Sequence, residues 1–378
     1  MNESKASRYQ RWRRRGRVAS AVTAATVLFL TVVTPLSRWL AAAAGRFSRG
    51  LSGAPADLVQ SIFFVLALVV LCEASLVPVL WYFEKRTRGS AKVTPEEVAV
   101  GQLQAAIVVA PVACVFAVIV RLSMTMAGGW WWGIAGVLVA AIVAAAIRVA
   151  PHVFVKLGAV RAIERPSLVR RLTELTRRAN LPVSEVGEWL IPDDSKPVAL
   201  VTGVGQGRRV LLASEIVREW PESEVEVVVA HELAHHRYLD LWRGLTLDAA
   251  VIVLALWFAD LGARRLGPFL GLGEASDLAA LPLLALFAGA AWTAATPLRW
   301  AQSRRQERRA DVFALTLTGA VDAFSSAIRR LEARHLVEAK PSRLTRLMFH
   351  RHPTVAERLE LAEAYRRHGG PVSTSDRR

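Results

Sequence analysis

Long apolar runs alternate with charged segments along the chain, and this alternation predicts a membrane protein. Each of the first four runs is long enough to cross about 30 Å of hydrocarbon as a helix. These runs cover residues 18–40, 58–83, 98–120 and 130–155. Three tryptophans open the fourth run, where an interfacial aromatic belt is expected. The pattern predicts a four-span membrane region over 18–155, followed by a mostly polar region over 156–368.

Two further apolar runs, at about 245–261 and 278–298, interrupt that polar region. The first run is short and contains Asp248 and Asp260. It is therefore expected either to pack inside the protein or to enter the membrane without crossing it. The second run is followed by five arginines, which is typical of a return to the cytoplasmic side.

The beginning of the chain has two interpretations. Small residues at 41–44 would suit cleavage of a signal peptide after the first apolar run. That run exceeds the usual core of about 7–15 residues and more runs follow it, which favours an uncleaved anchor. Residues 1–17, which contain RWRRRGR, are expected to form a disordered basic head, and residues 369–378 a polar tail.

Composition and charge support the same interpretation. Hydrophobic residues make up 53% of the 378 positions, and 48 Lys and Arg outnumber 32 Asp and Glu, which gives a net charge of +16. Because the basic residues flank the apolar runs, we expect a lipid bilayer as partner and no nucleic acid. Their placement puts the N-terminus and everything from residue 156 onward on the cytoplasmic side. Cys72 and Cys114 both lie in apolar runs, so neither a disulfide framework nor a cysteine metal site is expected.

Two charged residues, Glu73 and Arg148, lie within predicted spans, where a charge is costly unless it faces protein or water. One interpretation is that they line a polar chamber. The other is that they snorkel to the interface or form an interhelical pair. The sequence leaves both open.

The polar region shows local signs of secondary structure before its first histidine motif. Residues 167–179 have helical periodicity and many charges. Two short strands, at 198–202 and 210–213, flank the glycine-rich segment 203–209. That segment lacks the spacing and the βαβ context of a dinucleotide-binding loop, so a β-hairpin is predicted. The expected fold is mainly α, with a small β-hairpin or sheet in the cytoplasmic part.

The strongest chemical motif is HELAH at residues 231–235, inside a helix predicted over 222–238. The spacing of four places His231 and His235 on one helical face, where both can bind one tetrahedral zinc ion. Glu232 is next to them and can reach a water on the metal to take its proton. The alternative is a helix with two surface histidines and an ordinary glutamate.

A second pair of acidic residues, Glu307 and Asp311, follows the last apolar run, also four positions apart. Glu307 can supply the third protein ligand that a zinc site needs. Asp311 can accept the second N–H of a ligating histidine and so orient its ring. The alternative is a solvated helix face on which these acids pair with the five nearby arginines.

Together these pieces resemble the M48 peptidases, the family of Ste24 CAAX prenyl proteases and HtpX. The resemblance rests on 231–235, on Glu307 and Asp311, and on His352-Pro353 with Arg358 six residues after that histidine. It extends to the segments ALVTGVG, at 199–205, and RRVLL, at 208–212. It covers about residues 165–365, and the four early spans fit the Ste24 branch better than the shorter HtpX branch. Val198 stands where the family often has Asn, which leaves an edge-strand contact of that side chain in doubt.

The resemblance implies a zinc-dependent endopeptidase with a zincin-like domain on the cytoplasmic side. One Zn²⁺ per chain would be bound by His231, His235 and Glu307, with Glu232 as general base and proton donor. His352 would hydrogen-bond the substrate or the developing oxyanion. Strand 198–203 would add the substrate peptide as an extra strand, and His236 is expected to point away from the metal.

Other functions and several details stay open at this point. An M56-type antirepressor metalloprotease also combines membrane spans with this histidine motif, but it would need an extracellular sensor domain. A membrane scaffold with an inactive metal site would be expected to have lost a ligand or Glu232, and neither is lost. The substrates considered are prenylated CAAX tails, misfolded membrane proteins and short membrane-bound peptides. The oligomeric state is not predicted.

Overall fold

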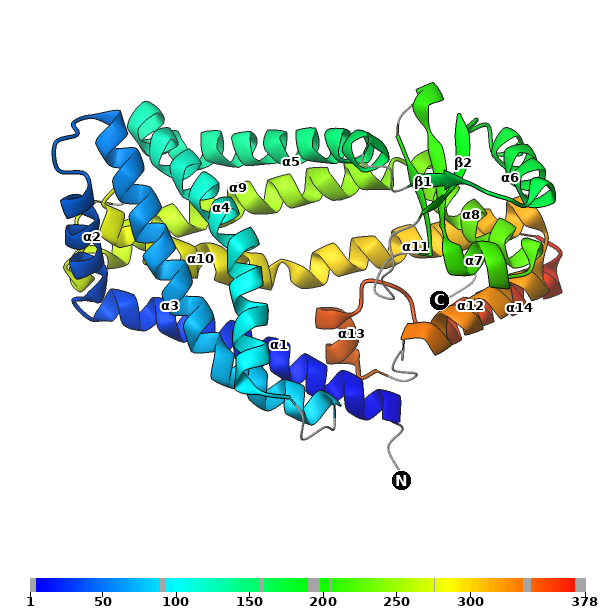
Figure 1. The fold of residues 1–378 in the computed structure, drawn as a ribbon, viewed down its shortest axis with the longest axis horizontal. Helices are drawn as coiled ribbons and strands as arrows, with labels where there is room; N and C mark the ends of the chain where they lie inside the picture. The colour runs from blue at the N-terminus through cyan, green and yellow to red at the C-terminus, as the bar shows by residue number, and fades with distance from the viewer. Residues whose placement is uncertain are drawn as a thin grey trace. The chain divides into compact units, whose positions relative to one another are not determined.

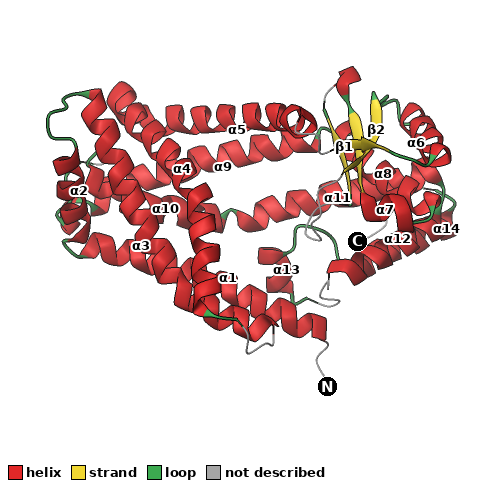
Figure 2. Ribbon diagram, viewed as in Figure 1, coloured by secondary structure: helices red, strands yellow, loops and turns green. Residues whose placement is uncertain are grey.

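The computed structural model describes residues 5–88, 93–156, 160–189, 198–203, 205–274, 276–335 and 341–370. Helices dominate, and the strands belong to one small sheet (Figure 2). The chain forms two compact units. The membrane unit comprises residues 1–142 and 247–296. We call residues 143–246 and 297–378 the peptidase unit, after the family that their sequence resembles. The chain changes unit inside helix α5 (Trp131–Lys156), whereas the sequence suggested a boundary after residue 155.

The membrane unit consists of long apolar helices. Its elements are α1 (Lys5–Val33), α2 (Leu36–Phe47), α3 (Ala54–Arg88), α4 (Pro95–Ala127), the turn η1 (Gly128–Trp130), the first part of α5, most of α9 (Asp240–Leu266), η3 (Pro268–Leu270), η4 (Leu278–Ala280) and α10 (Leu281–Ala294). Their ends follow local chemistry: the Thr94 side chain accepts a hydrogen bond from the Glu97 amide, and Pro95 occupies the first turn of α4.

Four helical stretches of the described chain are long and apolar enough to cross a membrane. They are Ser7–Val33, Pro55–Thr87, Pro95–Val149 and Asp240–Leu266. The third stretch contains α4 and α5, so the four predicted N-terminal runs correspond to α1, α3, α4 and α5. Leu278–Ala294 and Thr296–Thr318, which meet at a bend of 40°, together give a fifth candidate.

The structure corrects two expectations about the first 40 residues. The first apolar run, 18–40, is not one helix, because α1 ends at Val33 and α2 begins at Leu36. Pro35 stands between them and lacks the amide hydrogen that would continue the helical ladder. The basic segment expected to be disordered is helical from Lys5 onward, as the beginning of α1. Most of the predicted polar tail, from residue 371, lies outside the described residues.

The short run at 245–261 is part of the 27-residue helix α9, which is long enough to span a membrane. Asp260 of α9 accepts hydrogen bonds from two residues of the membrane unit. The Trp131 indole donates to Asp260 Oδ1 at 2.8 Å, and Arg264 Nε donates to Oδ2 at 2.8 Å. Glu73 accepts a hydrogen bond of 2.6 Å from Gln102 on the neighbouring helix, which favours the interhelical interpretation for that residue.

The peptidase unit contains a four-stranded sheet in the order β1-β2-β4-β3. Its strands are β1 (Val160–Ala162), β2 (Glu185–Trp189), β3 (Ala199–Thr202) and β4 (Arg209–Ala213). The predicted hairpin is confirmed as the antiparallel pair β3–β4, with Ala199 opposite Leu212. Its connection includes a 3₁₀ turn, η2 (Gly205–Gly207), and one residue outside the described set, Val204. The strands β1 and β2 were not predicted, and β3 forms an edge of the sheet.

The helices of this unit are α6 (Pro166–Arg178), α7 (Ser214–Glu219), α8 (Glu222–Arg237), α11 (Thr296–Thr318, apart from its first residue), α12 (Val321–His335), α13 (Arg343–Phe349) and α14 (Val355–His368). The motif helix α8 contacts α6, α12 and strand β3 (Figure 1). It is buried along most of its length. Val225, Val229 and Leu233 pack into one core with the sheet and α6, whereas Val227 packs against Phe324 of α12.

Two acidic residues near the start of α8 are buried and make ion pairs. Glu226 contacts Arg171 Nε at 2.6 Å and Arg178 Nη2 at 2.7 Å, both on α6. Glu224 contacts Arg330 Nε on α12 at 2.8 Å. The first two turns of α8 are therefore held by side chains of α6 and α12, in addition to any favourable interaction with the helix dipole.

Candidate metal centre

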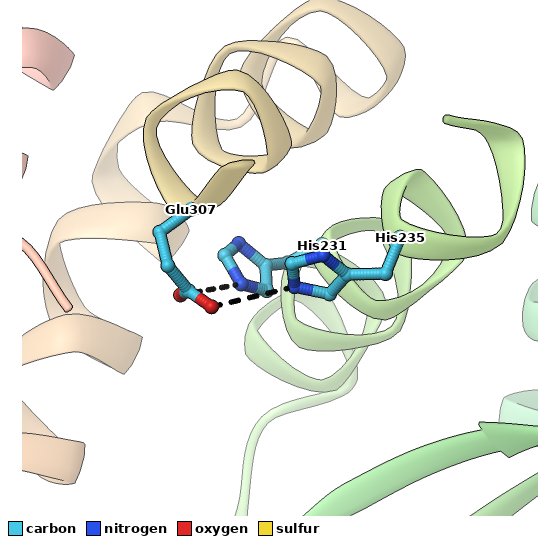
Figure 3. Close-up of side chains that lie close together, drawn as sticks. All are labelled: His231, His235 and Glu307. Atoms are coloured by element: carbon cyan, nitrogen blue, oxygen red, sulfur yellow. Dashed lines mark ion pairs between the residues drawn. The ribbon is translucent and has the colours of Figure 1, made fainter. Parts of the chain in front are cut away.

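Three side chains from α8 and α11 converge at one point (Figure 3). His231 Nε2 lies 3.4 Å from Glu307 Oε2, and His235 Nε2 lies 3.6 Å from Glu307 Oε1. One donor atom from each residue lies within 4.8 Å of the others. Helical spacing puts the two histidines on the same face of α8, and the bend before α11 is followed by a helix that presents Glu307 opposite them.

These separations fit a single tetrahedral ion. With metal–ligand bonds of about 2.0–2.1 Å, tetrahedral geometry places neighbouring ligand atoms about 3.3–3.4 Å apart. The observed 3.4 and 3.6 Å, measured to the two different oxygens of Glu307, are close to that value. The two imidazole rings are nearly perpendicular, at 84°, with centroids 5.0 Å apart. Nitrogen and carboxylate donors are also the ligand types that zinc prefers.

The second nitrogen of His231 faces Asp311. His231 Nδ1 lies 2.9 Å from Asp311 Oδ1, and the Asp311 side chain is completely buried. Arg358 of α14 holds both oxygens of this carboxylate: its Nε donates to Oδ2 at 2.8 Å and its Nη2 donates to Oδ1. The structure thus places Asp311 beside a candidate metal ligand, and the largely buried guanidinium of Arg358 balances its negative charge.

The second nitrogen of His235 has an equivalent partner that the sequence interpretation missed. His235 Nδ1 lies 2.9 Å from Asp240 Oδ2, and Asp240 is buried. Arg309 of α11 pairs with Asp240 Oδ1 while its guanidinium lies 4.1 Å from the centroid of the Tyr238 ring. The relevant signal in the sequence is an acidic residue five positions after the second histidine.

A tight backbone turn brings Asp240 back beside α8, next to His235. Helix α8 ends at Arg237, and Leu239 then adopts φ +55°, in the left-handed region that residues with a Cβ seldom occupy. Gln306 Nε2 donates to the Asp240 carbonyl at 3.3 Å, so both the side chain and the main chain of Asp240 contact α11. Strain of this kind is typical of functional sites.

The charges around the cluster favour a positive species between the carboxylates. Burial lowers the pKa of His231, but Asp311 and Glu307 outweigh it and raise this pKa to about 10. Burial raises the pKa of Glu232, and the Glu307 carboxylate acts in the same direction, while His231 and His235 oppose it. A glutamate whose pKa is raised in this way is suited to accept and return a proton near neutral pH.

His352 lies beside the cluster and contacts the candidate ligand Glu307. Its Nδ1 lies 2.8 Å from Glu307 Oε2, and 62% of its side chain is exposed. Two residues of α11 hold the segment before it: Trp300 Nε1 donates to the Met348 carbonyl at 3.0 Å, and Arg304 Nη1 donates to the His350 carbonyl at 2.8 Å. After it, Thr354 and Glu357 form a capping box at the start of α14.

His236, which was expected to point away from the metal, binds the sheet edge. Its Nε2 donates to the Val201 carbonyl of β3 at 2.8 Å. Ala213 N donates to the Val198 carbonyl, so the alternation of an antiparallel ladder directs the peptide groups of Ala199 and Val201 away from β4. Burial lowers the pKa of His236, which leaves the ring neutral near pH 7. One acceptor on the free side of β3 is therefore already occupied.

The other histidines do not join the cluster where their side chains are described. His368 Nδ1 contacts the Ala364 carbonyl of its own helix at 2.8 Å. The side chains of His152 and His335 lie outside the described set. Within the described part of the chain, His231, His235 and Glu307 are the group whose geometry could hold a metal ion.

The family model of peptidase family M48 matches residues 162–366, which is more than half of the chain and includes every residue of this cluster. The chain belongs to peptidase family M48. The match lies in the M48 family rather than the M56 family also considered from the sequence. Family membership makes the protein a metallopeptidase, and its long apolar helices make it a multi-pass membrane protein.

Several curated proteins are similar in sequence. The chain is 28% identical to the uncharacterized metalloprotease YhfN of Bacillus subtilis over 206 residues, 53% of this chain and 48% of that protein. It thus spans about half of YhfN. It is 29% identical to a protease HtpX homolog of Campylobacter concisus over 264 residues, 66% of this chain and 88% of the other. An HtpX homolog of Nostoc sp. is 32% identical over 188 residues, 46% of this chain and 60% of the other.

Among solved structures, the crystal structure of S. mikatae Ste24p has the same fold. It aligns with a TM-score of 0.73 and covers 94% of this chain and 87% of that one, at 17% sequence identity. The match extends beyond the peptidase unit to the membrane helices. It confirms the predicted architecture of a mainly helical membrane protein with a small sheet.

Proposed function

We propose that the protein is a zinc-dependent endopeptidase that cleaves membrane-associated proteins or peptides on the cytoplasmic side. The observation that carries the proposal is the convergence of His231 Nε2, His235 Nε2 and the Glu307 carboxylate at separations that suit one tetrahedral ion. Family membership supports the metallopeptidase class, and the proposal adds the metal, the residue roles and the side of the membrane.

The chain's own residues would divide the work as follows. One Zn²⁺ per chain is held by His231, His235 and Glu307, and when bound it polarises the scissile carbonyl and lowers the pKa of water to about 7. Glu232 removes a proton from the water that attacks the carbonyl carbon. It then gives that proton to the leaving amine nitrogen as the C–N bond breaks.

The residues around the ligands fix how those ligands can bind. Asp311 and Asp240 each face the Nδ1 of one proposed ligand histidine, so that with a metal bound Nδ1 would carry the proton and Nε2 would be free to bind the metal. Without both acids, each ring could bind through either nitrogen or turn away. The two pairs Asp311–Arg358 and Asp240–Arg309 therefore act as supports for the two histidines.

His352 and strand β3 are proposed to contact the substrate. His352 is exposed and lies next to the cluster, so a shift of its ring away from Glu307 would place an N–H donor beside a developing oxyanion. Strand β3 is at a sheet edge, where an extended peptide can add as a further strand. Ala199 and Val201 are 2% and 6% exposed, so a peptide pairing there requires the edge to become accessible.

The cytoplasmic location rests on the distribution of charge. Arg299, Arg304, Arg305, Arg308 and Arg309 follow the last apolar segment and lie in the same unit as the metal cluster. Short polar segments rich in Lys and Arg stay on the cytoplasmic side. Substrates are proposed to be membrane-associated because the catalytic unit is built into a membrane protein.

The test compares Glu232→Gln with Glu307→Gln in detergent-purified protein. Glu232→Gln keeps the side-chain shape but cannot accept the proton, so peptide hydrolysis should fall by at least about 10²–10⁴-fold while the zinc content stays near one per chain. Glu307→Gln should lower the zinc content itself. Full activity of Glu232→Gln would refute the catalytic assignment, and absence of stoichiometric zinc from the wild type would refute the metal assignment.

A further inference from the structure

The basic segment at the start of the chain is built into the membrane unit rather than attached to it as a tail. Helix α1 continues through it from Lys5, and its inner face packs against the end of α3. The Trp12 and Phe83 ring centroids are 6.1 Å apart. Gly16 is buried, and a Cβ there would lie 3.2 Å from Phe83 Cβ. The two helices therefore meet closely at the level where the apolar parts of both end.

This junction gathers positive charge around aromatic rings. The exposed basic residues are Arg8, Arg13, Arg15 and Arg17 of α1, and Lys85 and Arg86 of α3. Of the carboxylates in the described part of the chain, none lies within ion-pair distance of these six. Among the described residues these six cations outnumber the nearby carboxylate of Glu84, so this junction has a net positive charge, at a position where the lipid headgroups of one leaflet would lie.

Two guanidinium groups, one from each helix, share a single indole. Arg15 Cζ lies 5.2 Å from the Trp12 ring centroid, and Arg86 Cζ lies 5.6 Å from it. Arg86 also lies 5.4 Å from the Tyr82 ring. The indole attracts each cation, and both guanidinium groups lie within about 6 Å of the same ring centroid. An anion beside this ring could accept a charge-assisted hydrogen bond from each guanidinium group.

We propose that Arg15, Arg86 and Trp12 form a binding site for the phosphate of an anionic phospholipid. We assign a lipid rather than a free phosphate because the site lies at the end of two membrane helices. Trp and Tyr rings of this kind lie at the membrane interface. The acyl chains would follow the exposed apolar surface, which begins at Val18 of α1. Clusters of basic residues beside a span are typical of sites for anionic lipids. The site is independent of the metal centre.

The test uses the full-length protein in an uncharged detergent at about 0.15 M salt, which screens distant charges beyond about 8 Å. Binding of short-chain phosphatidylglycerol is measured against phosphatidylcholine. The first variant is Arg15→Gln/Arg86→Gln. The matched control, Arg13→Gln/Arg17→Gln, removes the same charge from exposed positions that lie away from the Trp12 face of α1.

We expect the wild type to bind phosphatidylglycerol at least ten-fold more tightly than phosphatidylcholine. Because one charge-assisted hydrogen bond contributes on the order of ten-fold, Arg15→Gln/Arg86→Gln should weaken binding about 100-fold and the control by no more than about five-fold. Trp12→Leu keeps both charges and should weaken binding roughly three- to ten-fold. Unchanged thermal midpoints in phosphatidylcholine would show that the variants fold.

Three results would overturn the proposal. Equal losses in the two double variants would mean that diffuse charge, not this pair, attracts the lipid. Equal binding of the two phospholipids by the wild type would show that the protein has no site selective for an anionic lipid. Displacement of phosphatidylglycerol by an equal concentration of inorganic phosphate would assign the site to a free anion instead of a lipid.

Discussion

Arg358 should be among the most costly single residues to replace in the peptidase unit. Its guanidinium balances the carboxylate of Asp311, whose side chain is completely buried, while the Arg358 side chain is only 14% exposed. Arg358→Met keeps much of the length and apolar contact but leaves the Asp311 charge without its main partner. Removing one partner of a buried pair costs about 3–5 kcal/mol.

The structure offers a matched control on the same helix. Arg366 of α14 pairs with Asp322, but these side chains are 47% and 92% exposed. A surface pair of this kind contributes about 0–1 kcal/mol. For a unit of roughly 150–250 residues, 1 kcal/mol shifts the midpoint by about 2–4 °C. Arg358→Met should therefore lower the midpoint by about 6–20 °C, and Arg366→Met by less than about 4 °C.

The assay is thermal unfolding of detergent-purified protein after removal of metal by a chelator, so that ligand affinity does not contribute to the midpoint. A double variant, Asp311→Leu/Arg358→Met, replaces both charges and should recover part of the loss. Its zinc affinity should stay low, because His231 has lost its carboxylate partner. Equal midpoints for Arg358→Met and Arg366→Met would refute the reasoning that a buried, unpaired charge dominates the effect.

Three further predictions concern the metal, pH and topology. Asp240→Ala should weaken zinc binding about 10–100-fold, measured by competition with a chelator, because His235 loses the partner that orients it, and Asp240→Asn should lose less. Burial raises the pKa of Glu188, but its hydrogen bond and charge interaction with Arg161 help to outweigh burial, and the pKa is lowered. Ionised Glu188 therefore stabilises the fold above the unfolded pKa of about 4.3, and this stabilisation is lost as pH falls through the lower folded pKa. Glu188→Gln should therefore reduce the acid-dependent part of the loss of stability, and an unchanged pH profile would contradict the assignment. A reporter fused at Arg171 should report the cytoplasmic side, and an external signal would overturn the topology.

The apolar runs predicted most of the membrane helices because a bilayer demands long, uninterrupted helices. They did not show where helices break or how far they extend. Pro35 divides the first run, and the helix of the basic segment depends on Trp12 and Phe83, which lie far apart in sequence. Such tertiary contacts leave no periodic signal. The strands β1 and β2 were missed because they are short and polar, and neighbouring strands hold them in place.

At the metal site, fixed spacing made three candidate ligands predictable, since positions four apart share a helical face. Asp240 could not be predicted in the same way, because its place beside His235 depends on the left-handed conformation of Leu239. The contact of His236 with β3 requires the relative placement of a helix and a sheet edge, which periodicity does not describe.

The proposed metal ligands lie on two helices that are far apart in the sequence, so the ribosome makes them at different times. His231 and His235 emerge on α8, but Glu307 follows only after the apolar helices α9 and α10. At about 5–20 residues per second, several seconds separate the two parts of the site. A nascent chain therefore carries both histidines and Glu232 without the third ligand. With the proposed ligands, a complete metal centre could form only after the helices between them have been made.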